Sequence, residues 1–124
     1  MPSPEDIGLM AHLMRRAGFS DPREEVEGRA TQGYEAVVEE LLYPERQPAI
    51  DDELLYRMFP GYEGAGAPPI NQADWVFRMI NTKRPLEEKM ALFWHQLFAT
   101  SNSKVDNPQE LTRQIAMFRE YGLG

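Results

Sequence analysis

The feature that most constrains the fold is a series of helix-start signals that recurs along the whole chain. Residues 3–6, Ser-Pro-Glu-Asp, place a capping serine before a proline and put acids in the first turn of a helix. Apolar residues then recur at helical spacing as far as Gly18, which is expected to end this helix in a left-handed conformation. Similar signals predict six more helices, beginning at Asp21, Tyr34, Asp51 or Asp52, Asn71, Pro85 and Asn107.

No segment alternates as a strand does, and no repeat of fixed period is visible, so the predicted fold is all-α. We expect an irregular bundle of about six to seven helices that forms a single helical domain over residues 1–124. The last helix runs to the C-terminus with nothing after it to pack on, which predicts the N-terminal part of a longer chain. Residues 61–69 hold three glycines and two prolines and are expected to form a flexible loop.

Composition excludes several classes of function. The formal net charge of -7 repels phosphate backbones, which argues against general nucleic-acid binding. No apolar run approaches the roughly 20 residues that span a bilayer, so no membrane insertion is predicted. The absence of cysteine excludes disulfides and thiolate chemistry. The N-terminus lacks the basic and apolar regions of a signal peptide, which makes a cytoplasmic location the default.

Residues 86–99 form the most informative segment, because on a helical wheel they are apolar nearly all round. We therefore predict a central, buried helix. Glu88 and His95 project along almost the same line of this helix, two turns and roughly 10.5 Å apart. They could flank a shared ligand or a third side chain. The alternative is a core histidine bonded to a backbone carbonyl, with Glu88 solvated near the helix start.

A second group of polar residues, His12, Arg15 and Arg16, clusters on the polar face of the first predicted helix. Three potential donors on one face could hold a carboxylate or a phosphate. In the alternative interpretation, the two arginines pair with acidic residues on neighbouring helices.

Familiar catalytic and phosphate-binding motifs are absent from the sequence. The acidic run 51–53 is better explained by helix capping than by metal binding. His12 and His95 are the only histidines, and nothing requires them to meet, so no metal site is predicted and no cofactor can be named.

Two stretches resemble a known family. Residues 12–19, HLMRRAGF, resemble the opening HLLRRAGFG of the bacterial domain-of-unknown-function family 1800 (DUF1800), and residues 84–105 resemble its signature PLxEKMxLFWHxxFAT…KV. Ser20 and Gln96 depart from the usual small residue, often glycine, and the frequent asparagine. The resemblance singles out His12, Arg15, Arg16, Lys89, Trp94, His95 and Lys104 as motif positions.

The resemblance implies a helical fold and a protein several times longer, often exported, but no established activity. The function predicted first is a helical binding or assembly module, whose partner is the rest of its own longer chain or another protein. The alternative is the N-terminal part of an enzyme that uses His12, Arg15, Arg16, Glu88 and His95, with its active site completed by further chain.

Overall fold

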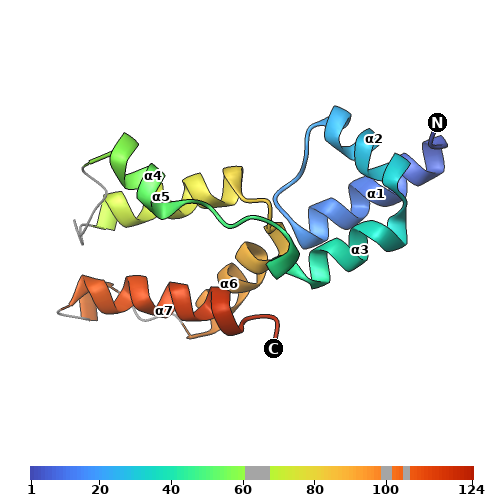
Figure 1. The fold of residues 1–124 in the computed structure, drawn as a ribbon. Helices are drawn as coiled ribbons and strands as arrows, with labels where there is room; N and C mark the ends of the chain where they lie inside the picture. The colour runs from blue at the N-terminus through green and yellow to red at the C-terminus, as the bar shows by residue number, and fades with distance from the viewer. Residues whose placement is uncertain (61–67, 99–101, 105–106) are drawn as a thin grey trace.

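The computed structural model describes residues 1–60, 68–98, 102–104 and 107–124, and within these ranges the regular structure is entirely helical (Figure 1). The all-α prediction is therefore confirmed. The helices are α1 (Pro4–Ala17), α2 (Arg23–Gln32), α3 (Tyr34–Leu42), α4 (Asp52–Met58), α5 (Pro68–Asn81), α6 (Pro85–Phe98) and α7 (Pro108–Tyr121), with short 3-10 turns η1 (Pro44–Arg46) and η2 (Asn102–Lys104).

Three of the predicted helix starts are capped as the sequence indicates. Ser3 forms a capping box with Asp6, in which each side chain accepts a hydrogen bond from the other residue's backbone N–H. The Asp51 side chain accepts from the backbone of Leu54 at the start of α4. At the start of α7, the Asn107 side chain accepts from the backbone N–H of Gln109. These caps satisfy backbone donors that the first helical turn leaves free.

Two of the predicted helix starts, at Asp21 and Asn71, are wrong. Asp21 does not cap α2, because its carboxylate pairs instead with Arg29 one and a half turns into the helix, at 2.9 Å. Asn71 does not cap α5 either, because that helix already begins at Pro68. Of the flexible loop predicted over 61–69, residues 61–67 lie outside the described ranges, and residues 68 and 69 belong to α5.

The end of α1 also differs from the prediction. Gly18 is extended, with φ -146°, and the left-handed residue is Ser20, with φ 75°. Glycine is suited to position 18 for a different reason, since a Cβ there would lie 3.2 Å from the Cβ of Pro85. The close approach of α1 to the start of α6 therefore favours a residue without a side chain.

Helices α1, α2 and α3 pack together as a three-helix unit around one apolar cluster (Figure 1). Its fully buried side chains include Met10, Met14 and Val37. The cluster as a whole consists of Met10, Met14, Ala17, Val26, Val37 and Leu41. Leu86, at the start of α6, packs against it and links this unit to the rest of the chain.

Helix α6 is the link between the two ends of the molecule. Its contacts extend to α1 and α3 in the N-terminal unit and to α5 and α7 on the other side (Figure 1). Near its first turn, the Lys89 ammonium donates to the carbonyl of Gly18 at 2.9 Å. The single domain predicted over residues 1–124 stays a prediction, which separate unfolding of the two ends would contradict.

The second half of α6 is not buried as predicted. Phe93, Leu97 and Phe98 are 46%, 60% and 60% exposed. Helices α5 and α7 pack against α6, but about half or more of each of these three side chains stays exposed. The prediction was wrong here because an apolar wheel shows that a helix needs cover on all sides and does not show that the chain supplies it. None of the described helices is long and apolar enough to cross a bilayer.

Candidate functional site

Glu88 is the one charged side chain in the described residues that is buried, with 4% of its surface exposed. It lies on the inner side of α6, and each carboxylate oxygen has its own donor. The indole Nε1 of Trp75, on α5, donates to Oε2 at 2.9 Å. The Nε of Arg119, on α7, donates to Oε1 at 2.5 Å. One carboxylate thus joins three helices.

This arrangement explains how a charge can lie in the interior. A buried carboxylate without partners would lose its hydration at a large cost in free energy, and the cation and the indole N–H replace that hydration. Charge-assisted bonds of this kind are shorter and stronger than neutral ones. Because each oxygen accepts a hydrogen bond from a different helix, Glu88 holds Trp75 and Arg119 against α6.

The contacts of Glu88 with Trp75 and Arg119 are called here the Glu88 clamp. His95 lies near this clamp and contacts the same tryptophan. Its ring meets the Trp75 indole edge to face, with ring centroids 5.0 Å apart and an interplanar angle of 85°. Glu88 and His95 thus flank a third side chain, Trp75, which is one of the two arrangements that their positions on the helical wheel indicated. The alternative of a solvated Glu88 is wrong, and Nδ1 of His95 is buried with no hydrogen-bond partner among the described residues.

The surroundings of Glu88 perturb its neighbour on α6. Partial burial raises the pKa of Glu87, the positive charge of Arg84 opposes this, and the negative charge of Glu88 adds to it. Arg119 also acts on Glu87 through its charge and lowers the pKa. The guanidinium of Arg119 thus acts on two carboxylates, although only Glu88 holds it by a hydrogen bond.

A second polar link joins α4 to α5. Arg78 donates to Asp52 at 2.6 Å and to Asp74 at 3.0 Å. Burial disfavours the charged form of Arg78, but these hydrogen bonds and charges more than offset it and raise its pKa. The acidic run at 51–53 is thereby explained by a helix cap at Asp51 and an ion pair at Asp52.

The basic group on α1 has a different environment. His12, Arg15 and Arg16 are all exposed, as the helical wheel predicted. The alternative, in which the arginines pair with acids on neighbouring helices, finds no support, since no ion pair to Arg15 or Arg16 occurs within the described ranges.

The two predicted groups do not come together. Helices α1 and α6 meet where Gly18 approaches Pro85, and from there they run in different directions (Figure 1). His12 lies six residues before that point, roughly 9 Å along α1, and His95 lies ten residues beyond it, roughly 15 Å along α6. In the described part of the chain, no three histidine or acidic side chains gather as metal ligands would.

Sequence reasoning missed the partners of Glu88. No sequence motif singles out Arg119, and an aromatic residue at helical spacing such as Trp75 is the ordinary pattern of a helix core. No local signal connects position 88 with position 119, because their contact depends on how α6 and α7 pack. Two motif positions are also structural: Lys89 binds Gly18, and the indole of Trp94 donates to the carbonyl of Gly122 at 2.9 Å.

Comparison with known proteins supports the resemblance seen in the sequence. The model of a protein family of unknown function, DUF1800, matches residues 12–124. The chain belongs to the DUF1800 family. No curated protein and no solved structure matches the chain. The DUF1800 match begins at His12 and includes every candidate site residue, but the family description assigns no activity to any of them.

Proposed function

We propose that this chain is a helical assembly module, in which α4 to α7 pack against a further protein surface. The partner is the rest of a longer chain or another protein. The observation that carries the proposal is that each of these four helices presents an apolar pair at positions i and i+4 to solvent. The pairs, called here the exposed stripes, are Leu54 and Met58, Val76 and Ile80, Phe93 and Leu97, and Met117 and Tyr121.

Residues four apart lie on the same face of a helix, one turn above each other. Such a pair is the pattern that a helix normally buries. In α1 to α3, by contrast, the exposed large apolar side chains are Leu9, Tyr34 and Leu42, and no two of them are one turn apart on the same helix. The exposed stripes are therefore a property of α4 to α7 and not of the whole surface.

Covering the stripes would be favourable. Burying one leucine or phenylalanine side chain contributes about 1.5–3 kcal/mol. Large contiguous apolar patches are rare on monomeric proteins and mark interaction sites where they occur. Four helices that each leave a pair uncovered thus favour association with another surface.

The first experiment compares two double variants. Leu97→Ser with Met117→Ser removes one residue from each of two stripes, whereas Leu9→Ser with Leu42→Ser removes two equally exposed leucines from α1 and α3. We expect the first variant alone to reduce binding of an apolar fluorescent dye and concentration-dependent self-association, measured by sedimentation. If the first variant instead unfolds like a core variant, or leaves both measurements unchanged, the proposal fails.

A second experiment identifies the partner. Hydrogen exchange of α5 to α7 is compared between residues 1–124 and any longer natural form of the protein. We expect slower exchange in the longer form if its own remaining chain covers the stripes. Equal exchange in both forms points to another protein as the partner.

The alternative function, part of an enzyme, is favoured by one observation only: the buried Nδ1 of His95 has no partner among the described residues. Unpartnered buried polar atoms are rare and call for an explanation. The stability of His95→Ala separates the two functions, because a packing role predicts a clear loss and a site role predicts little loss. His12, Arg15 and Arg16 would then belong to a separate anion site on α1.

A further inference from the structure

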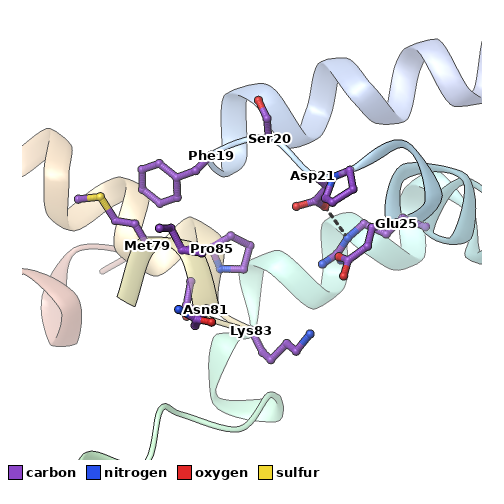
Figure 2. Close-up of a pocket in the computed structure, with 12 residues that line it drawn as sticks. Phe19, Ser20, Asp21, Glu25, Met79, Asn81, Lys83 and Pro85 are labelled. Carbon is purple, nitrogen blue, oxygen red and sulfur yellow. Dashed lines mark hydrogen bonds and ion pairs between the residues drawn. The ribbon is translucent and has the colours of Figure 1, made fainter. Parts of the chain in front are cut away.

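A cavity of about 510 Å³ lies away from the Glu88 clamp, between the connection from α1 to α2 and the connection from α5 to α6 (Figure 2). This volume falls within the range of small-molecule sites. Neither the exposed stripes nor the Glu88 clamp requires a cavity at this position. Its lining combines apolar and charged side chains.

The walls of the cavity are held in place by hydrogen bonds. Lys89 donates to the carbonyl of Gly18, and its ammonium lies 5.1 Å from the centre of the Phe19 ring. On the other connection, the hydroxyl of Thr82 accepts from the backbone N–H of Arg84 at 2.9 Å. Ligand sites are usually preformed in this way, which lowers the entropy lost on binding.

The cavity has two chemically different sides. Phe19 and Met79 form an apolar side, with Pro85 between them and the opposite wall (Figure 2). The charged side carries Asp21 and Glu25, which come from the start of α2 and the residues before it. A ligand that fills the space must therefore combine an apolar part with charged groups.

The charges that line the cavity are not equally available. Arg29 donates to Asp21 at 2.9 Å and to Glu40 at 3.2 Å, so its charge is already neutralised. Glu25 and Lys83 also line the cavity and are exposed, and neither has an ion pair within the part of the chain that the structure describes. One carboxylate and one ammonium are thus free to bind a ligand.

The geometry points to a binding site for a small zwitterionic molecule with an aliphatic part, which is the chemistry of a free amino acid such as leucine. The ligand's ammonium pairs with Glu25, and its carboxylate pairs with Lys83. Its side chain lies against Pro85, which Figure 2 shows between the charged wall and the apolar pair Phe19 and Met79. The cavity shares one lining residue, Ile80, with the exposed stripes, but the charged groups that bind the ligand do not belong to the stripes.

L-leucine is the probe for the test, and backbone amide shifts in NMR spectra give the readout. We expect saturable shifts at Ser20 and Thr82, which border the cavity. Glu25→Gln and Lys83→Gln should each weaken binding about threefold to fivefold, as expected for one exposed ion pair. N-acetyl-leucine, which lacks the ammonium, and leucinamide, which lacks the carboxylate, should bind more weakly than leucine.

The matched control is Glu24→Gln, because Glu24 is the neighbouring exposed acid on α2 and does not line the cavity. It should bind leucine like the unaltered chain. The inference is overturned if leucine gives no saturable shift, if Glu24→Gln weakens binding as much as Glu25→Gln, or if both analogues bind as well as leucine. Circular dichroism of each variant verifies that the helices are intact.

Discussion

The two ends of the molecule bury different kinds of residue. Helices α1 to α3 enclose six apolar side chains in one cluster. In the described part of α4 to α7, the buried apolar residues are only Leu55, Ala91 and Phe118, and the carboxylate of Glu88 is buried with them. The first unit is thus held mainly by apolar contact, and the second depends on a polar clamp.

The difference matters because the two interactions have different consequences. Apolar burial is non-directional and supplies most of the free energy of folding. A buried ion pair supplies little net stability, because the cost of desolvation offsets the attraction between the charges. Removing only one partner is costly, because the other charge stays buried without compensation. The clamp can therefore fix how α5, α6 and α7 are oriented while leaving their apolar stripes for a partner to cover.

Arg119→Met should have the largest effect, a loss of about 3–5 kcal/mol, because it leaves the Glu88 carboxylate buried without its cation. The loss should be concentrated in α5 to α7. Both tryptophans, Trp75 and Trp94, lie in these helices, so their fluorescence during urea unfolding reports on this end of the chain.

The matched control for Arg119 is Arg113→Met on the same helix. Arg113 pairs with Glu110 at the surface, where ion pairs contribute little, so the expected change is within about 0.5 kcal/mol. Equal losses for the two arginine variants would show that the clamp has no special role.

Met14→Ala is the corresponding change in the apolar unit. Met14 is almost fully buried, and its truncation should cost about 2–5 kcal/mol through lost contacts and the cavity left behind. Far-UV circular dichroism should show α1 to α3 unfolding earlier in urea, before the tryptophan emission changes. Met58→Ala, at an exposed position of α4, should change stability by less than about 0.5 kcal/mol.

If tryptophan emission and circular dichroism shift together in both the Arg119 and the Met14 variants, the two ends unfold as one cooperative domain. That outcome would confirm the single domain predicted from the sequence. It would also contradict the division into an apolar unit and a separately clamped unit.

The sequence predicted the helices well because their signals are local. Ser3, Asp51 and Asn107 cap helices through bonds that span three residues or fewer, so their effect can be inferred from neighbouring positions. Asp21 shows the limit of this reasoning. The same residue type that caps a helix elsewhere is engaged by Arg29 here, and the choice between the two depends on packing.

The candidate site was predictable only in part. The wheel placed Glu88 and His95 on one line of α6, and the structure places Trp75 against both. The partner Arg119 could not be inferred, because the angle between α6 and α7 decides which residue reaches Glu88. The exposure of Phe93 could not be predicted from the sequence either, because hydrophobic periodicity does not show which helices pack over a given face.

Ser20→Gly should stabilise the N-terminal unit, although glycine usually destabilises. Ser20 has φ 75°, and the left-handed conformation costs an L-residue about 1–2 kcal/mol. The greater freedom of glycine in the unfolded chain offsets about 0.5–1 kcal/mol of this, which leaves a gain of up to about 1.5 kcal/mol. Urea unfolding followed by circular dichroism measures the gain, and Ser20→Ala, which keeps a Cβ, should show none.

The smallest effects concern two carboxylates whose pKa values shift in opposite directions. Hydrogen bonds from the side chain and backbone of Ser3 lower the pKa of Asp6 in the capping box of α1. Burial raises the pKa of Glu87 on α6. Asp6 therefore contributes stability that is present above its unfolded pKa and is lost as pH falls through its lowered folded value. Glu87 favours the folded state below its unfolded pKa, and this contribution is lost as pH rises through its raised folded value.

Asp6→Asn and Glu87→Gln should consequently change thermal stability with opposite signs. At neutral pH, Asp6→Asn should lower the melting temperature, and the difference should close in acid. Glu87→Gln should raise the melting temperature slightly at neutral pH, since burial disfavours its charge, and the gain should vanish below the usual carboxylate pKa of 4.5. A loss for Glu87→Gln at neutral pH would mean that attraction to Arg84 and Arg119 outweighs burial. The charge of Arg119 would then stabilise a second carboxylate on α6, that of Glu87, in addition to that of Glu88.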